Sequence, residues 1–342
     1  MIPPLITLEE HYFSTAAINT LDDKMVEQFK HIPGLKDKLT DAGQLRLSEM
    51  DKGKVSFQII SHACVAGAPS LDVCREGNDQ LANDIKNNRD RFAGFAVLPM
   101  ADPQECANEL ERTVKQLGFV GAMIDNHVHG KYYDGNEYDV FWAKAQDLDV
   151  AIYLHPTWPS DNMNPQYTGN FPESAGRSMG ASGWGWHTET GLHILRLFAA
   201  GVFDKFPKLK IIIGHFGEML PFQLQRICNL SVRWGERERK LKQVWDENIC
   251  RQTMSTWKVN ANVAIGITTS GVWSLDPLRC ILGNTKIDHI LYSVDYPFAK
   301  NEEGLEWVEK LEKSGLLTQE QLEMVAYRNA EKLLNVKAPA RT

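Results

Sequence analysis

Short runs of apolar residues recur along the whole chain, and Gly, Pro, Asp or Asn residues bound most of them. The runs are rich in Val, Ile, Phe and Tyr and are too short for most helices, which is typical of buried β-strands. Eight runs are found: Leu5–Glu9, Val55–Ser61, Phe92–Pro99, Phe119–Asp125, Val150–His155, Lys210–His215, Val263–Ser270 and His289–Asp295. We therefore expect eight strands spread over the full length of the sequence.

Segments with helical periodicity separate these runs. They are Leu71–Asn88, Pro103–Leu117, His187–Phe203, Glu218–Asp246, Glu303–Lys313 and Thr318–Leu334, the last being an amphipathic helix that ends near residue 335. Apolar strands that alternate with helices predict a parallel sheet covered on both faces. Eight repeats favour an α/β fold of the (β/α)8 type, a TIM barrel that occupies residues 1–342 as one domain. An open doubly wound sheet is the alternative, but the sequence lacks a glycine-rich nucleotide-binding loop.

The composition narrows the classes of partner. Of the 342 residues, 43% are apolar and 24% are charged, which is normal for a globular protein. A net charge of −7 argues against nucleic acid or an anionic membrane as a partner. The six cysteines form no CxxC pair, which indicates free thiols in a reducing compartment. The N-terminus lacks a secretory signal pattern, and no apolar run approaches the roughly 20 residues that span a bilayer, so we expect a cytoplasmic protein.

One long polar segment, residues 157–182, is rich in proline and glycine. It follows directly after His155, at the end of the fifth predicted strand. Long loops without secondary structure are usually functional, so we interpret this segment as an active-site lid. A surface insertion without a role is the alternative.

Carboxylate and imidazole side chains stand at the ends of three predicted strands. Glu9 and His11 belong to the first, His155 ends the fifth and Asp295 ends the eighth. Each of them alone is more often a structural residue, but in a barrel the carboxyl ends of all strands meet at one mouth. Strand alternation places Glu9 and His11 on one side and Glu10 on the other. This mixed N/O set predicts one divalent metal with open coordination positions, Zn²⁺ first, with Mn²⁺ or Mg²⁺ as alternatives.

A histidine and a glutamate follow the sixth predicted strand in the segment Gly214–Glu218. Glu218 can hold the tautomer of His215 and raise its basicity, which favours an acid/base role over metal ligation. A glutamate favoured by the dipole of a helix N-terminus is the alternative. Arg226 lies two helical turns further on and either orients Asp295 or the substrate carboxylate, or forms a structural salt bridge.

Two absences argue against a binuclear metal centre. The first strand carries Glu-x-His where binuclear metallohydrolases of this barrel type usually carry His-x-His, and the fourth, Phe119–Asp125, contains no lysine. A hydroxide that bridges two cations is therefore not expected as the nucleophile.

Together these motifs resemble the non-oxidative hydroxybenzoate decarboxylases of the amidohydrolase superfamily, which include γ-resorcylate, 2,3-dihydroxybenzoate and salicylate decarboxylases. The resemblance runs from about Leu5 to Leu334. The motifs that carry it are Leu8–His11, Asp90–Phe92, Leu154–Pro156, Gly201–Asp204, Gly214–Glu218, Thr268–Gly271, Ser293–Phe298 and Arg328–Ala330.

The resemblance implies a metal centre formed by the four strand-end residues named above. It places His215, supported by Glu218, beside a bound aromatic ring, and it places Arg226 close to Asp295. His11 favours the resorcylate branch over members that lack this second imidazole. The implied partner is a small aromatic acid, and the implied assembly is a homodimer or homotetramer.

The chain departs from the family in two places. After the second strand it has Ser61–Cys64, and after the fourth it has Asp125–His129, both richer in histidine than most members. His62, His127 and His129 either contact ring hydroxyls of the substrate or are exposed loop residues.

The predicted reaction is reversible loss of CO₂ from an ortho-hydroxybenzoate, without redox change. The difficult step is protonation of the ring carbon that carries the carboxylate, and Asp295 is the first candidate for the acid, with His215 and Glu218 relaying protons. A metal that chelates one carboxylate oxygen and the ortho-hydroxyl would stabilise phenolate charge. Phe298 and Ala63 are expected to bind the substrate.

The sequence leaves two other classes of function open. The same site can hydrolyse a lactone or amide, with Asp295 as the base for a bound water. A metal-dependent structural or binding protein is the third class, and such a protein would unfold when its metal is removed.

Overall fold

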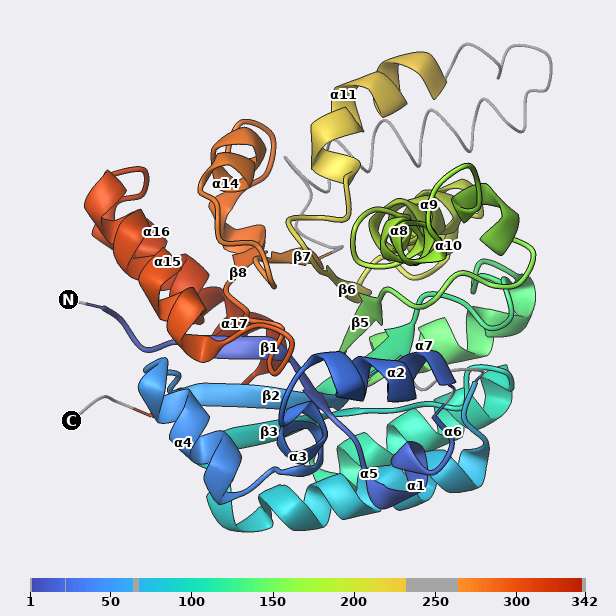
Figure 1. The fold of residues 1–342 in the computed structure, drawn as a ribbon, viewed down its shortest axis with the longest axis horizontal. Helices are drawn as coiled ribbons and strands as arrows, with labels where there is room; N and C mark the ends of the chain where they lie inside the picture. The colour runs from blue at the N-terminus through green and yellow to red at the C-terminus, as the bar shows by residue number, and fades with distance from the viewer. Residues whose placement is uncertain (1, 22, 64–67, 232–263, 340–342) are drawn as a thin grey trace.

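Eight parallel strands form one sheet in the order β1-β2-β3-β4-β5-β6-β7-β8 (Figure 1). The computed structural model describes residues 2–21, 23–63, 68–231 and 264–339. The strands are β1 (Ile6–Tyr12), β2 (Phe57–His62), β3 (Phe92–Ala96), β4 (Gly121–Asp125), β5 (Ala151–His155), β6 (Lys210–Ile213), β7 (Ala264–Thr268) and β8 (Ile290–Leu291). The predicted (β/α)8 barrel and its eight strands are confirmed, although the predicted start of the seventh strand, Val263, lies outside the described residues.

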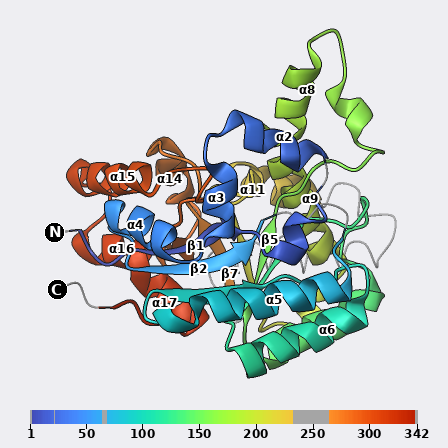
Figure 2. The same cartoon turned by 60° about the horizontal axis from the view of Figure 1, so that its bottom comes forward.

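Helices connect the strands and surround the sheet (Figures 1 and 2). Between β1 and β2 lie α1 (Thr15–Ile18), α2 (Asp23–His31), α3 (Leu35–Thr40) and α4 (Gln44–Lys52). Then follow α5 (Leu71–Ile85), α6 (Pro103–Arg112), α7 (Asp139–Asp147), α8 (Glu173–Gly180), α9 (Gly185–Ala199), α10 (Val202–Lys205) and α11 (Leu220–Ser231). The chain ends with α14 (Asp276–Ile281), α15 (Asn301–Ser314), α16 (Gln319–Glu323) and α17 (Asn329–Leu334).

The predicted helices are present where the structure describes them, with local breaks. The helix predicted from His187 to Phe203 is divided into α9 and α10, because Gly201 has a φ of +74° between them. A π-helical turn, Met324–Arg328, joins α16 to α17 within the predicted C-terminal helix. Residues 232–246 of the helix predicted after Glu218 lie outside the described residues.

The helices α1 to α4 were not predicted. They are short, and α3, for example, buries Leu35 and Leu39 alone. Such a short apolar face produces no extended helical period in the sequence.

An irregularity in β1 determines which of its side chains face the mouth of the barrel. The register of β1 against β2 shifts between Thr7 and Glu10. Leu8 packs in the apolar interior of the barrel, yet Glu9 and not Glu10 continues toward the mouth. A local bulge changes the strict alternation of side chains. Glu9 and His11 lie on one side and Glu10 on the other, as predicted, and the irregularity determines which side faces the mouth.

The strand β8 is shorter than predicted. Only Ile290 and Leu291 pair as a strand, whereas the sequence predicts a run to Asp295. Beyond them the backbone turns toward β1, where His11 N donates to Tyr296 O over 2.6 Å. The β1–β8 seam is thus closed by this contact and by side chains rather than by a long ladder.

Apolar side chains fill the interior of the barrel. Leu8, Ile59, Phe95 and Ile212 pack there with residues from neighbouring strands, and Leu334 of α17 packs against the same cluster. Because the interior is filled, we expect a site at the end of the barrel where the carboxyl ends of the strands lie.

The segment predicted as a lid contains structure of its own. It includes α8, which stands away from the barrel body in Figure 2. A cavity of about 390 Å³ lies within it between Trp158, Tyr167 and Arg177, and none of the predicted metal ligands lines this cavity. The role of the segment as a lid stays a prediction.

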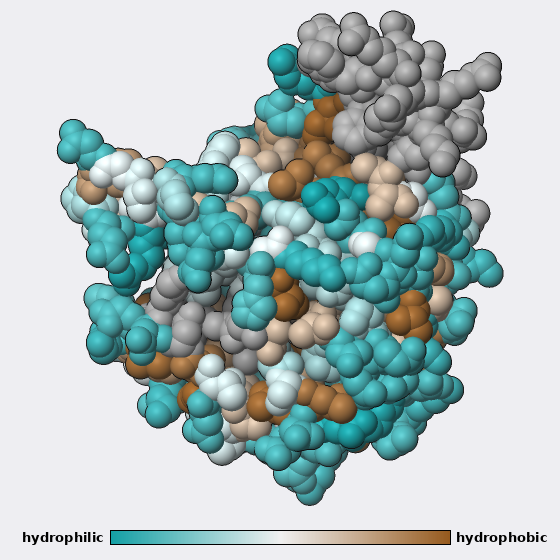
Figure 3. Space-filling view, turned by 90° about the vertical axis from the view of Figure 1, so that its right-hand side faces the viewer, coloured by the Kyte–Doolittle hydropathy of each residue, from teal (hydrophilic) through white to brown (hydrophobic). Residues whose placement is uncertain are grey.

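The outer surface is largely hydrophilic on the face shown in Figure 3, with hydrophobic residues in separate patches. Within the described residues, no helix has both the length and the apolar composition needed to cross a bilayer.

Gly53 provides a test of how closely α4 packs against α15. It follows α4, and a Cβ at this position would lie 2.3 Å from Cβ of the buried Asn301 at the start of α15. We expect Gly53→Ala to force the two helices apart and to lower the free energy of unfolding by about 1–3 kcal/mol. Urea denaturation measures this change.

Gly283→Ala is the matched control, because its Cβ would meet only Cys280 O at 3.4 Å, an ordinary contact. We expect this control to stay within about 0.5 kcal/mol of the parent chain. Equal stabilities of the two variants would contradict the proposed close packing of α4 against α15.

Candidate active site

Side chains from several strand ends converge on one cavity at the mouth of the barrel. Its volume is about 450 Å³. Among its lining residues are His11, Ala63, His155, His187, His215 and Phe298. The convergence predicted from the strand ends is therefore present in the fold.

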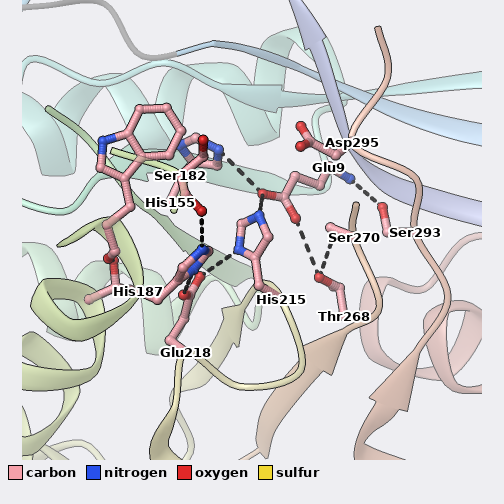
Figure 4. A network of polar contacts seen from close by, with 12 residues as sticks. Glu9, His155, Ser182, His187, His215, Glu218, Thr268, Ser270, Ser293 and Asp295 are labelled. Carbon is pink, nitrogen blue, oxygen red and sulfur yellow. Dashed lines mark hydrogen bonds and ion pairs between the residues drawn. The ribbon is translucent and has the colours of Figure 1, made fainter. Parts of the chain in front are cut away.

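Glu9 is the centre of the polar network at this mouth (Figure 4). It is fully buried, and its Oε2 accepts a hydrogen bond from the Tyr153 hydroxyl, with the Thr268 hydroxyl 3.4 Å away. Its other oxygen, Oε1, has no hydrogen-bond partner and lies 3.3 Å from His155 Nε2. A buried carboxylate oxygen without a donor is costly unless a cation faces it.

Three ligand atoms, one each from Glu9, His11 and His155, lie within 4.8 Å of one another. Asp295 adjoins them, with its Oδ1 3.0 Å from His11 Nε2. A set of carboxylate oxygens and imidazole nitrogens suits a divalent metal such as Mn²⁺ or Zn²⁺. The residues present therefore fit a divalent metal ion.

Burial and neighbouring charges shift the pKa values of these groups in different directions. Burial raises the pKa of Asp295 to about 8, with the charge of Glu9 adding to the effect. Burial opposes the ionisation of Glu9, but His215, His155 and His11 outweigh it and hold the pKa of Glu9 well below its usual value. Burial lowers the pKa of His11 to about 4, so this imidazole is neutral and able to bind a metal at neutral pH.

His215 and Glu218 form an ion pair on a turn of unusual conformation. His215 Nδ1 lies 2.8 Å from Glu218 Oε1. All five residues from His215 to Met219 have positive φ angles, between +47° and +90°, and only Gly217 adopts them without strain. Strained backbone of this kind gathers at functional sites, where surrounding contacts maintain it. One of these contacts is Phe216 N donating to Thr268 O over 2.8 Å.

The charge of this pair is also unusual. Burial alone would lower the pKa of His215, but Glu218 and Glu9 outweigh it and raise the pKa to about 10. His215 is therefore an imidazolium at neutral pH. Its Nε2 lies 3.8 Å from Glu9 Oε1, so the positive charge faces the metal cluster.

His187 was not predicted as a site residue, yet it shares Glu218 with His215. His187 Nδ1 lies 2.7 Å from Glu218 Oε2, and its Nε2 donates to Ser182 O over 2.9 Å. His187 thus connects the end of the predicted lid to the buried carboxylate (Figure 4). The sequence signal for it was weak, because His187 lies near the start of a helix and not at a strand end.

Tyr153 was also missed. It lies two residues before His155 in an apolar strand, so alternation places both side chains on the same face. This alternation was the available signal. The Tyr153 hydroxyl binds Oε2 of Glu9, and the other oxygen of Glu9 faces the imidazoles of the cavity.

The predicted substrate-binding residues lie in different places. Ala63 and Phe298 line the cavity, and the Phe298 ring packs edge-on against His11 with 5.5 Å between centroids. Arg226 is exposed on α11 and is not among the described lining residues. The role of each in substrate binding stays a prediction.

The three additional histidines, His62, His127 and His129, differ in burial. His129 is exposed, in agreement with a loop residue. His62 and His127 are buried and line a cavity of about 20 Å³ beside Ala63, which is large enough for one water molecule.

The family model described as amidohydrolase matches residues 66–336. The chain belongs to the amidohydrolase family. Decarboxylase orsB from Emericella nidulans is 57% identical to this amidohydrolase over 341 residues, which cover 98% of each chain. The crystal structure of 2,6-dihydroxybenzoate decarboxylase from Rhizobium has a TM-score of 0.81 at 29% identity, and the match covers 97% of this chain and 99% of that one.

A third similar protein carries a metal. The dihydroxybenzoic acid decarboxylase structure from Polaromonas, with bound manganese and the inhibitor 2-nitroresorcinol, has a TM-score of 0.77 at 30% identity and covers 97% of both chains. The predicted resemblance to the hydroxybenzoate decarboxylases is confirmed by these relatives.

The pKa of Asp295 generates a prediction for this amidohydrolase. Below about pH 8 a proton competes with a metal for this carboxylate, so the affinity for Mn²⁺ should fall as the pH falls. One competing proton corresponds to about a tenfold change per pH unit between pH 6 and 8. Calorimetric titration of the metal-free protein with Mn²⁺ measures this slope.

Asp295→Asn is the matched control, since it removes the titrating group and keeps the shape. We expect weaker binding with a flatter pH dependence in this variant. The same slope in both proteins would show that another group releases the proton.

Proposed function

We propose that this amidohydrolase is a metal-dependent decarboxylase that releases CO₂ from an ortho-hydroxybenzoate. The observation that carries the proposal is the arrangement around Glu9. Asp295 Oδ1 lies 3.0 Å from His11 Nε2 and His215 Nε2 lies 3.8 Å from Glu9 Oε1, so a carboxyl group and an imidazole adjoin the same cluster (Figure 4). The 57% identity to a decarboxylase over nearly the whole chain supports this reaction class.

The cavity suits a small aromatic acid. The apolar part of its lining consists of Trp186, Val272, Phe298 and Ala299. The imidazoles among the lining residues provide polar contacts. Binding sites for small molecules combine an apolar lining with a few placed polar groups. A volume of about 450 Å³ accommodates one substituted ring.

A divalent metal held by the four predicted ligands would supply Lewis-acid stabilisation of negative charge on the carboxylate and the ortho oxygen. We propose Mn²⁺ as the first metal to test, because a similar structure holds manganese. Zinc stays the alternative that the sequence favoured.

The protein residues would perform the proton transfer. Asp295 delivers its proton to the ring carbon that carries the carboxylate. The carbon–carbon bond then breaks, its electron pair returns to the ring, and CO₂ leaves. His215 stabilises the negative charge of the bound acid, and Glu218 keeps the imidazole charged and oriented. A new proton must then reach Asp295, and the reverse sequence carboxylates a phenol.

Hydrolysis of a lactone or amide is the second candidate. It would use Asp295 as a base, and a base requires a carboxylate rather than a proton-bearing carboxyl. The decarboxylase relatives favour the first candidate. A homodimer or homotetramer in the cytoplasm remains part of the proposal.

Product analysis tests the reaction class. We expect the metal-loaded protein to release CO₂ from at least one of salicylate, 2,3-, 2,4- and 2,6-dihydroxybenzoate and a vanillate-type acid, and to lose this activity on chelation. Mass spectrometry of the phenol together with CO₂ detection measures the reaction. Acid release or ring opening of a lactone or amide without CO₂ would favour the hydrolase.

His215→Asn separates the acid/base site from the metal site. Because His215 is not a predicted metal ligand, we expect metal content to stay unchanged while kcat falls about 10²–10⁴-fold. Steady-state kinetics and elemental analysis measure the two quantities. His289→Asn is the control, since that imidazole contacts Ile265 O outside the cavity, and it should keep nearly full activity. An unchanged kcat in His215→Asn would remove His215 from the mechanism.

A further inference from the structure

Glu10 lies between two predicted metal ligands on β1 but has no part in the chemistry above. Its side chain is fully buried, and both oxygens accept hydrogen bonds. Oε1 accepts from Val294 N over 3.1 Å, and Oε2 accepts from Tyr296 N over 3.1 Å. These two amides flank Asp295, whose φ of +74° is rare for a residue with a side chain. One carboxyl group thus holds the peptide unit that follows Asp295 and the unit between Ser293 and Val294.

The hydroxyl of Ser293 extends this contact to Glu9. Ser293 Oγ donates to Glu10 Oε1 over 3.0 Å. The same oxygen accepts from Leu8 N over 3.0 Å and from Glu9 N over 2.9 Å. A hydroxyl offers one donor and two acceptor positions, so Ser293 uses all of them in joining β1 to the segment after β8.

Arg46 connects the network to His11. It comes from α4, is fully buried, and donates from Nη2 to the backbone oxygen of His11. It also donates to Gln58 Oε1 over 3.1 Å, and Gln58 Nε2 lies 3.3 Å from Glu10 Oε2. Gln58 therefore links the guanidinium of Arg46 to the side chain of Glu10.

We infer that Glu10 is a positioning residue for the metal centre. Its network contacts the backbone of Glu9 and His11 and the peptide unit that follows Asp295, so it reaches three of the four predicted ligands. Glu10 is not among the described lining residues of that cavity, so it acts through the ligands and not on the substrate. The inference rests on the proposed metal centre.

A glutamine cannot replace this carboxylate without conflict. Each oxygen of Glu10 accepts one main-chain N–H, Val294 on one and Tyr296 on the other. In either orientation, an amide would therefore place its NH₂ group against an N–H that cannot turn away. Glutamine has nearly the same size as glutamate, but the main chain around Asp295 must move to avoid this contact.

The test is the dissociation constant for Mn²⁺ of Glu10→Gln, measured by titration of the metal-free protein. Residues that orient metal ligands typically contribute 10–100-fold to metal affinity, and we expect a weakening of about this size. The melting temperature of the metal-free protein is measured in parallel, because the loss of buried hydrogen bonds also lowers stability.

Glu109→Gln is the matched control. Glu109 is an equally buried carboxylate that accepts from Arg112 and Asn78 on the outer helices, away from the cavity. We expect it to lower the melting temperature and to leave the Mn²⁺ dissociation constant unchanged. Glu10→Gln should differ from this control in affinity and not only in stability.

The outcomes separate this inference from the proposed function. An unchanged dissociation constant in Glu10→Gln, with a lower melting temperature, would overturn the positioning role and leave the metal centre in place. Failure of the unsubstituted protein to bind Mn²⁺ or Zn²⁺ would overturn the metal centre itself. If Glu10→Gln does not fold, Ser293→Ala removes only the hydroxyl, and an affinity equal to that of the unsubstituted protein would overturn the inference.

Discussion

The buried charge of Glu9 is the constraint on which the site depends. A carboxylate without exposure to water is costly unless donors and cations compensate it. Tyr153 and Thr268 compensate one oxygen, and imidazoles face the other. The surrounding residues are therefore arranged by electrostatics as much as by packing. A divalent cation at the free oxygen would complete this compensation.

The same contacts close the barrel and position residues of the site. The last strand has only two paired residues, so the backbone alone contributes little to the seam with β1. Ser293 and Glu10 supply the missing contacts through their side chains. Because these contacts lie next to Glu9 and Asp295, the residues that close the sheet also bring the two carboxylates together. A substitution that weakens the seam is therefore expected to displace residues of the predicted metal site.

The sequence predicted the fold because the signals for it are long-range and repeated. Eight apolar runs with helical segments between them leave few alternatives. The strand-end residues Glu9, His11 and His155 were predicted for the same reason, since parallel closure places the carboxyl ends of all strands together. The short helices before β2 lacked such a repeated signal, and so they were missed.

The rest of the site depends on local geometry that the hydrophobic periodicity of the sequence does not indicate. His187 reaches Glu218 from a helix, and its relevance follows only from the position of α9. The left-handed turn that begins at His215 contains residues that ordinarily avoid positive φ, so the sequence argues against it. The network of Glu10 was hidden because a strand side chain that faces away from a mouth is usually assigned to packing.

The separation of Glu9 from the segment after β8 also has a consequence for biosynthesis. The hydrogen bond from Glu9 N to Ser293 joins positions 284 residues apart. During translation the first strand leaves the ribosome long before the segment that carries Asp295 exists. Domains whose contacts join distant parts of the chain fold slowly, because the intervening loop must close first. The four predicted ligands can therefore come together only after the segment that follows β8 has been synthesised and has closed the barrel, so complete metal binding would follow barrel closure.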